Sequence, residues 1–154
     1  MFKEMRRQKR QISEEEVKDI LIKSEYGTLA TICEDGYPYS TPLSYVYHNG
    51  AIYFHCARSG QKLTNIENNN KVSFSVVGNT ELLPSKFSTN YESVILFGNA
   101  TKVEGEEKEA ALVKIIEKYS QGFITGGKEY ISKAKDITIV IKIDIDHITG
   151  KAIR

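Results

Sequence analysis

Hydrophobic positions along the chain follow two spacings, one typical of amphipathic helices and one typical of strands. Residues 1–12 are charged and irregular. After them, in the segments predicted to be helical, apolar residues recur every three or four positions. Ser13 and Glu16 form a capping-box pattern that marks the beginning of the first helix. The helices predicted in this way are 13–25, 61–68, 106–120 and a weaker one, together with a loop, within 121–136.

Between the helices, β-branched and aromatic residues gather in short runs bounded by turn signals. The predicted strands are 27–33, 37–48, 51–57, 71–77, 91–103 and 137–147, with a polar loop at 79–90. Asp35-Gly36 and Asn49-Gly50 are hairpin signals, so neighbouring strands pair antiparallel. This pattern predicts a mainly β domain over 1–154, in which six strands close into a small barrel with peripheral helices.

Composition narrows the class of protein. The chain has 154 residues, with 21 Lys and Arg against 20 Asp and Glu, and a net charge of +1. This balance argues against a general nucleic-acid binder, and no apolar run is long enough to cross a membrane. Without an apolar segment behind the basic N-terminus, a cytoplasmic protein is expected. The two cysteines and three histidines lack ligand spacing, so no metal site is expected.

The segment 54–62 is the most informative for chemistry. A predicted strand runs through Ser59 and Gly60 into a helix whose first turn carries Lys62. Free N–H groups at a helix start attract anions, and a lysine adds a full positive charge. Two interpretations stay open: a phosphate pocket, or a solvated turn with a surface lysine. The spacing matches neither a Walker loop nor a Rossmann turn.

Two neighbouring features suit a flat ligand. The strand from Tyr39 to Tyr45 mixes hydroxyl and apolar side chains, and Pro42 leaves backbone groups free for a heteroaromatic ring. An edge strand protected by proline explains the same pattern. His55 is either a ligand-facing donor and proton carrier or a partly buried structural histidine.

Taken in chain order, short segments of this sequence form a recognisable set: 5–12, 27–31, 35–39, 42–43, 52–55, 60–63, 93–100 and 148–152. On these segments the chain resembles the FMN-binding split barrels related to pyridoxamine 5'-phosphate oxidase, and within them the nitroimidazole-resistance (Nim) branch. The resemblance implies a six-stranded antiparallel split β-barrel and a homodimer with FMN at the subunit interface.

The resemblance also implies a set of cofactor-binding residues. Gly60, Gln61 and Lys62 are expected around the phosphate, and Ser93 with Val94 are expected to face the cofactor from either subunit. The other implied contacts are Tyr39, Ser40, Thr41, Pro42, Leu43, Ser44, His55, Cys56 and Ala57. The true oxidases carry Arg at the position of Tyr39 and Ser-Arg-Lys at 60–62, and their C-terminal arginine motif is absent here. Oxidation of pyridoxamine phosphate is therefore not expected.

The expected activity is that of an FMN-dependent oxidoreductase. A reduced nicotinamide, NADH or NADPH, would supply electrons, and a small acceptor such as a nitroaromatic or a quinone would take them. His55 is the candidate catalytic proton donor. The alternative is a non-enzymatic module of the same fold that binds flavin or haem, for storage or stress response. A related barrel that prefers the deazaflavin F420 is a third interpretation.

Overall fold

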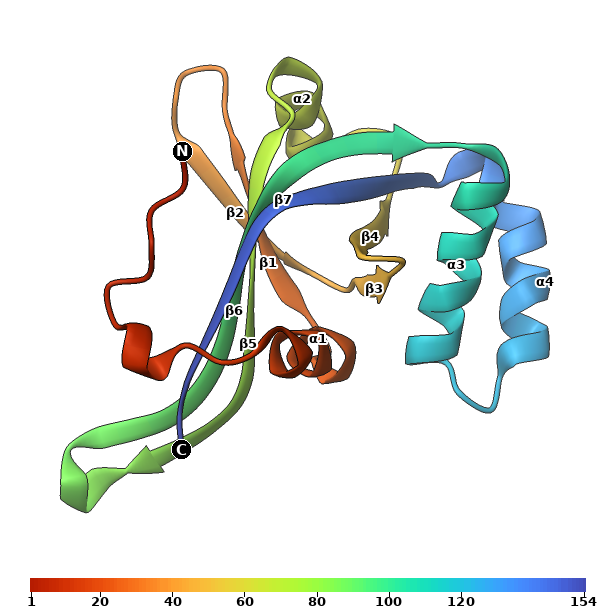
Figure 1. Cartoon of the computed structure of the whole chain (residues 1–154). Helices are drawn as coiled ribbons and strands as arrows, with labels where there is room; N and C mark the ends of the chain where they lie inside the picture. The colour runs from red at the N-terminus through yellow and green to blue at the C-terminus, as the bar shows by residue number, and fades with distance from the viewer.

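The computed structural model describes all 154 residues and contains one antiparallel sheet with the strand order β2-β1-β5-β6-β7-β4-β3 (Figure 1). Its strands are β1 (Gly27–Ile32), β2 (Pro38–Leu43), β3 (Val46–His48), β4 (Ala51–Cys56), β5 (Lys71–Leu83), β6 (Ser88–Val103) and β7 (Ile139–Ile153). The prediction of six strands in a closed barrel was wrong in two respects. There are seven strands, and the edge strands β2 and β3 do not pair, so the curved sheet remains open.

The additional strand arises because the segment 37–48 breaks at Tyr45. The Tyr45 side chain turns into the core, and its hydroxyl donates a hydrogen bond to the Leu21 carbonyl at 2.6 Å. Its backbone N–H donates to the Tyr119 hydroxyl at 3.0 Å, and its carbonyl accepts from Lys118 at 3.1 Å. Because side chains from a distant helix satisfy this backbone, the ladder stops after Leu43 and restarts as β3.

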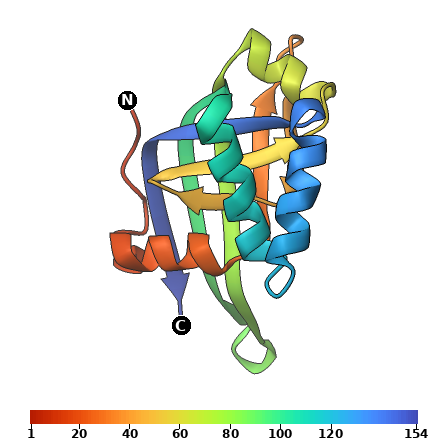
Figure 2. The same ribbon diagram turned by 90° about the vertical axis from the view of Figure 1, so that its right-hand side faces the viewer.

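Four α-helices cover the sheet: α1 (Glu14–Lys23), α2 (Gln61–Asn68), α3 (Gly105–Tyr119) and α4 (Ile124–Ala134). The predicted capping box is confirmed, since the Ser13 hydroxyl accepts from the Glu16 N–H while the Glu16 carboxylate accepts from the Ser13 N–H. Figure 2 shows α3 and α4 side by side over β3, β4 and β7, with α1 crossing near one end. None of these helices combines the length and the hydropathy that a bilayer-spanning segment needs.

The hydrophobic core has two parts, which lie on opposite sides of the sheet. The larger cluster fills the concave side and contains Leu21 from α1, Leu63 from α2 and Phe74 from β5. The smaller cluster lies between β4 and the α3–α4 pair, around Tyr53 and Ile115. The first cluster therefore fixes α1 and α2 on the sheet, and the second fixes the helical hairpin.

A long hairpin formed by β5 and β6 departs most from the sequence prediction. The segment 79–90 was predicted as a loop, yet both strands continue through it to a short 3-10 turn at Pro84–Lys86. Figure 1 shows this hairpin extending beyond the body at the end of the sheet opposite α2. We call residues 79–90 the arm. A register shift between Val77 and Thr80 marks the bulge at which the arm begins.

Candidate functional site

The N-terminus of α2 has the local geometry of an anion site. Gly60 precedes the helix with φ +151° and ψ +165°, a conformation that is essentially restricted to glycine. No side chain caps the helix, so the N–H groups of its first turn remain available, and Lys62 lies half-buried within that turn. A Cβ at Gly60 would meet no atom within 4 Å, so the backbone faces open space here.

A hydrogen-bonded network holds this helix start against the sheet. The Gln61 amide donates to the Asn65 side-chain oxygen at 2.7 Å, and the Asn65 amide donates to the Thr31 hydroxyl at 2.9 Å. The same Asn65 nitrogen lies 3.5 Å from the Cys33 sulfur. Asn65 and Thr31 are each only 1% exposed, so both polar groups are buried and paired. The network fixes α2 against β1, next to which β2 lies.

The predicted residues of β2 divide between its two faces. Tyr39, Thr41 and Leu43 pair with Thr31, Leu29 and Gly27 of β1, whose positions on the concave side are buried. The alternate residues Ser40 and Pro42 therefore face the convex side and are exposed. The structure thus brings Tyr39 close to the Thr31–Asn65–Gln61 network. Ser44 lies beyond the strand end and lines a different cavity.

His55 and Cys56 lie at the end of β4 on opposite faces. Cys56 packs against the larger core cluster, whereas His55 is exposed on the side of Tyr53, which packs toward α3. Although part of the ring is exposed, the buried part is desolvated, and this lowers the pKa of His55 below its usual value, so the ring is neutral at pH 7. Burial raises the pKa of the Cys56 thiol, although the Lys62 ammonium opposes this, so the thiol stays protonated. Ala57 follows on the exposed loop.

Ser93 and Val94 are far from the start of α2. Val94 is 0% exposed and points into the core, which leaves only its backbone for a ligand, while Ser93 lies half-buried on the convex face opposite Val77. Asn99 lies in the part of β6 that is near α2. The next residue, Ala100, donates its N–H to the carbonyl of Asn70, in the loop after α2, at 2.8 Å. From Ser93 to Asn99 the strand rises about 20 Å at about 3.3 Å per residue. One chain therefore does not bring Ser93 and Lys62 together.

Sequence reasoning missed three residues that shape this region. Arg58, on the loop before Gly60, donates a hydrogen bond to the Asp136 carbonyl at 2.7 Å and ties the loop to the end of the helical hairpin. Asn65 and Thr31 are polar residues within predicted elements, and nothing in their spacing shows that they are buried. Arg58 lies within segment 54–62, and its positive charge was the sequence feature that could have identified it.

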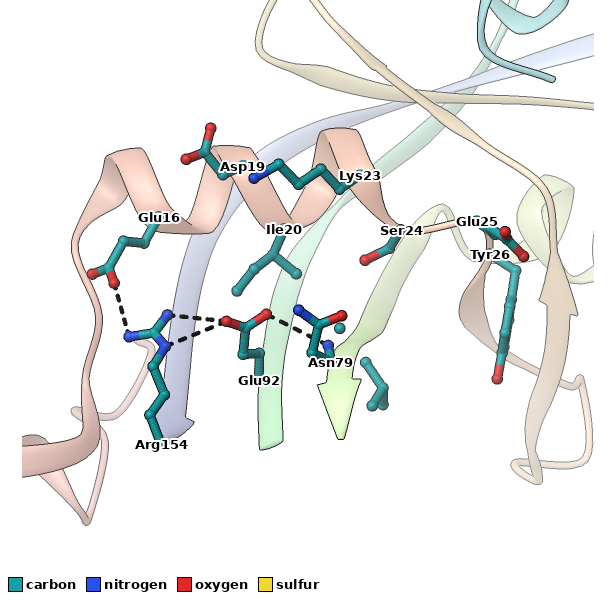
Figure 3. A pocket seen from close by; sticks show the side chains of 12 residues that line it. Glu16, Asp19, Ile20, Lys23, Ser24, Glu25, Tyr26, Asn79, Glu92 and Arg154 are labelled. Atoms are coloured by element: carbon teal, nitrogen blue, oxygen red, sulfur yellow. Dashed lines mark hydrogen bonds and ion pairs between the residues drawn. The ribbon is translucent and has the colours of Figure 1, made fainter. Parts of the chain in front are cut away.

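Two other cavities lie around the C-terminal end of α1. One, of about 560 Å³, lies between α1 and the base of the arm and contains Glu16, Glu92 and Arg154 (Figure 3). The other, of about 840 Å³, lies between α1 and α3 and contains Ser44, Lys118 and other residues of those helices. Lys118 rests on the Tyr45 ring, 4.0 Å from its centroid, and burial lowers the pKa of this ammonium to about 8. No group of three or more His, Cys, Asp and Glu side chains is arranged to hold a metal ion.

Comparison with known families decides the relationship. The profile of the pyridoxamine 5'-phosphate oxidase family matches residues 13–152, which is nearly the whole chain. The chain belongs to this family. The resemblance noted in the sequence is thereby confirmed, and the open antiparallel sheet with peripheral helices is the pyridoxamine 5'-phosphate oxidase fold. Curated protein sequences contain no match to the chain.

Solved structures share this fold at low sequence identity. Rv2991, a conserved protein from Mycobacterium tuberculosis, has 24% identity and a TM-score of 0.83, over 97% of this chain and 90% of that one. A protein assigned to 5-nitroimidazole antibiotic resistance in Bacteroides thetaiotaomicron has 22% identity and a TM-score of 0.75, over 92% and 86%. An FAD and haem binding protein from Mycobacterium smegmatis has 19% identity and a TM-score of 0.81, over 93% and 73%.

Proposed function

We propose that this member of the pyridoxamine 5'-phosphate oxidase family binds FMN between two copies of the chain and works as an NAD(P)H-dependent reductase of small acceptors. The observation that carries the proposal is the start of α2. There an uncapped helix, a glycine-only conformation at Gly60 and the cation of Lys62 occur together in a chain of this family. A phosphate group suits this combination of donors and charge.

The residues present fit the parts of FMN. Lys62, with the N–H groups of the first turn of α2, would hold the phosphate, and Gly60 would let the backbone approach it closely. The concave-side residues of β2, Tyr39 and Thr41, would face the ring system beside the buried Thr31–Asn65 pair. When bound, the flavin supplies the electron transfer, and the chain orients it and shields it from water.

The separation within one chain supports a site shared between two copies. Ser93 lies about 20 Å along β6 from the part of that strand near the loop after α2, so Lys62 and Ser93 would contact one FMN from different copies. The convex face next to Ser93 carries the exposed apolar side chains Val77 and Ile95, which suits a buried homodimer interface. A two-fold axis through such a face would create two equivalent sites.

His55 is the residue proposed to contact the acceptor. Its exposed imidazole is neutral at pH 7, so it can donate one hydrogen bond or relay a proton without carrying charge. The protonated thiol of Cys56 is not suited to nucleophilic chemistry. The flavin therefore carries the redox step, and His55 positions or protonates the acceptor.

The visible spectrum of the purified protein and a charge deletion test the proposal. Wild type should carry a flavin absorption band and be bleached by NADH or NADPH without oxygen. Lys62→Ala should weaken FMN binding about 10- to 100-fold, the effect of losing one charged hydrogen bond of about 1.5–3 kcal/mol. Lys128→Ala, which removes an exposed lysine from α4, is the matched control and should bind FMN as wild type does. Unchanged FMN affinity in Lys62→Ala contradicts the phosphate assignment.

A second candidate function is a non-enzymatic module that binds flavin or haem. His55 favours it, because an exposed, neutral imidazole is the form of histidine that ligates iron. A structure with the same fold is an FAD and haem binding protein. Mass spectrometry of the extracted cofactor separates FMN, F420 and haem. A flavin that neither NADH nor NADPH reduces in stopped-flow mixing would favour the module over the reductase.

A further inference from the structure

The tip of the arm exposes large apolar side chains to solvent. Leu82 is 75% exposed and Phe87 is 98% exposed. Phe87 also has φ +50° and ψ +43°, a left-handed conformation that is uncommon for an aromatic residue. Within one chain, the tip therefore has an unfavourable backbone conformation and no burial to offset it. A two-stranded ribbon of this kind is marginally stable in water by itself.

The base of the arm, by contrast, makes ion pairs and a hydrogen bond with neighbouring elements (Figure 3). The Arg154 guanidinium binds Glu92 of β6 at 3.1 Å and Glu16 of α1 at 2.9 Å, so it joins three elements. The second oxygen of Glu92 accepts from the N–H of Asn79, the first residue of the arm, at 3.5 Å. A Cβ at Gly78 would lie 2.9 Å from the Glu92 carboxylate, so a larger residue there would displace that side chain. These contacts set the direction in which the arm leaves the body.

The arm starts beside a residue that the proposed flavin site requires from a second copy. Ser93 pairs with Val77 at the base, and the strand then runs from Ser93 to Phe87 over about 20 Å at about 3.3 Å per residue. Because the arm continues the β5–β6 hairpin that carries Ser93, placing Ser93 of one copy against the FMN of another also directs the arm toward that other copy. Tyr39, Gly60 and Gln61 all lie on open surface, so the FMN site of a single chain lacks an outer wall.

We propose that the arm of one copy packs against the second copy and closes the open side of its FMN site, with Leu82 and Phe87 as the apolar contacts. The occupant of this surface is a second copy of the chain, because the exposed convex face at Val77 and Ile95 continues directly into the arm. The inference rests on the proposed function. It adds that residues of the arm complete the cofactor site across the interface.

The test compares two pairs of surface substitutions. The arm variant combines Leu82→Ser and Phe87→Ser, and the matched control combines Phe123→Ser and Tyr130→Ser, which are 76% and 70% exposed on or beside α4. We expect the arm variant to melt at the wild-type temperature, to bind FMN at least tenfold more weakly and to leave bound flavin more open to iodide quenching. Light scattering should show more monomer at micromolar concentration. The control should match wild type in all four measurements.

A photo-crosslink locates the contact directly. Phe87→p-benzoyl-phenylalanine should link two copies through residues within 37–62 of the other chain, as mass spectrometry of the crosslinked peptide would show. If wild type binds FMN and the arm variant has the same FMN affinity, iodide quenching and mass as wild type, this inference is overturned and the proposed function stands. Wild type that binds no FMN would overturn the proposed function and this inference with it.

Discussion

Replacing Asn65 with alanine tests whether the buried network at the start of α2 supports the candidate site. The change removes the hydrogen bond to Thr31 at 2.9 Å and the one from Gln61 at 2.7 Å, in a position that is 1% exposed. A buried hydrogen bond contributes about 1 kcal/mol net, and the small cavity left by the amide adds to this. We expect Asn65→Ala to lower the free energy of unfolding by about 2–3 kcal/mol.

Urea unfolding followed by circular dichroism measures this difference. With a slope of about 2 kcal/mol per molar urea, the midpoint should fall by about 1–1.5 M. Asn68→Ala is the matched control, because it changes the same side chain on the same helix at an exposed position, where about 0.5 kcal/mol or less is expected. FMN affinity should fall in Asn65→Ala, since Gln61 loses its anchor. A wild-type midpoint for Asn65→Ala would refute the argument that this network holds α2.

Three further predictions follow from local geometry and charge. Gly60→Ala should destabilise the fold by about 1–3 kcal/mol because of its backbone conformation, whereas Gly126→Ala, in α4 and with open space around it, should be neutral or stabilising in the same urea assay. In an NMR titration of the folded protein, the pKa of the His55 ring should lie below 6.5. In the urea-unfolded protein it should be about 6.5. Near this pH the folded protein therefore binds fewer protons than the unfolded protein. Its free energy of unfolding should decrease as the pH drops below 6.5, and the decrease should be smaller in His55→Gln. Burial lowers the pKa of Lys118 from 10.5 to about 8. The free energy of unfolding of wild type, measured relative to Lys118→Met, should therefore decrease as the pH falls from about 10.5 to 8.

Elements with one buried face were predictable from sequence, and elements without one were not. The alternation of isoleucines from Ile139 to Ile145 identifies β7, because that strand has one face in the core. The capping box at Ser13 marks the start of α1 for a local reason. The arm has solvent on both faces, so its polar residues carry no alternation, and 79–90 resembles a loop in sequence.

Long-range hydrogen bonds account for the break that sequence did not show. Tyr45 looks like a continuing strand residue, yet its backbone pairs with the side chains of Lys118 and Tyr119, more than seventy positions away. No local pattern contains that information, because the partners come from a helix that packs on the sheet only after folding. The division of 37–48 into β2 and β3 was therefore outside the reach of spacing arguments.

The candidate site shows the same limit at the level of the assembly. Ordered motifs could name Lys62 and Ser93 as residues of one cofactor site, but motifs do not say which copy of the chain supplies each. Ser93 lies about 20 Å along β6 from Asn99, which is near the loop after α2, so within one chain Ser93 lies away from α2. In the proposed shared site the two residues come from different copies, and the contacts of Arg154 at the base of the arm would then direct the arm toward the second copy. In the proposed shared site, the exposed Phe87 would pack against the second copy.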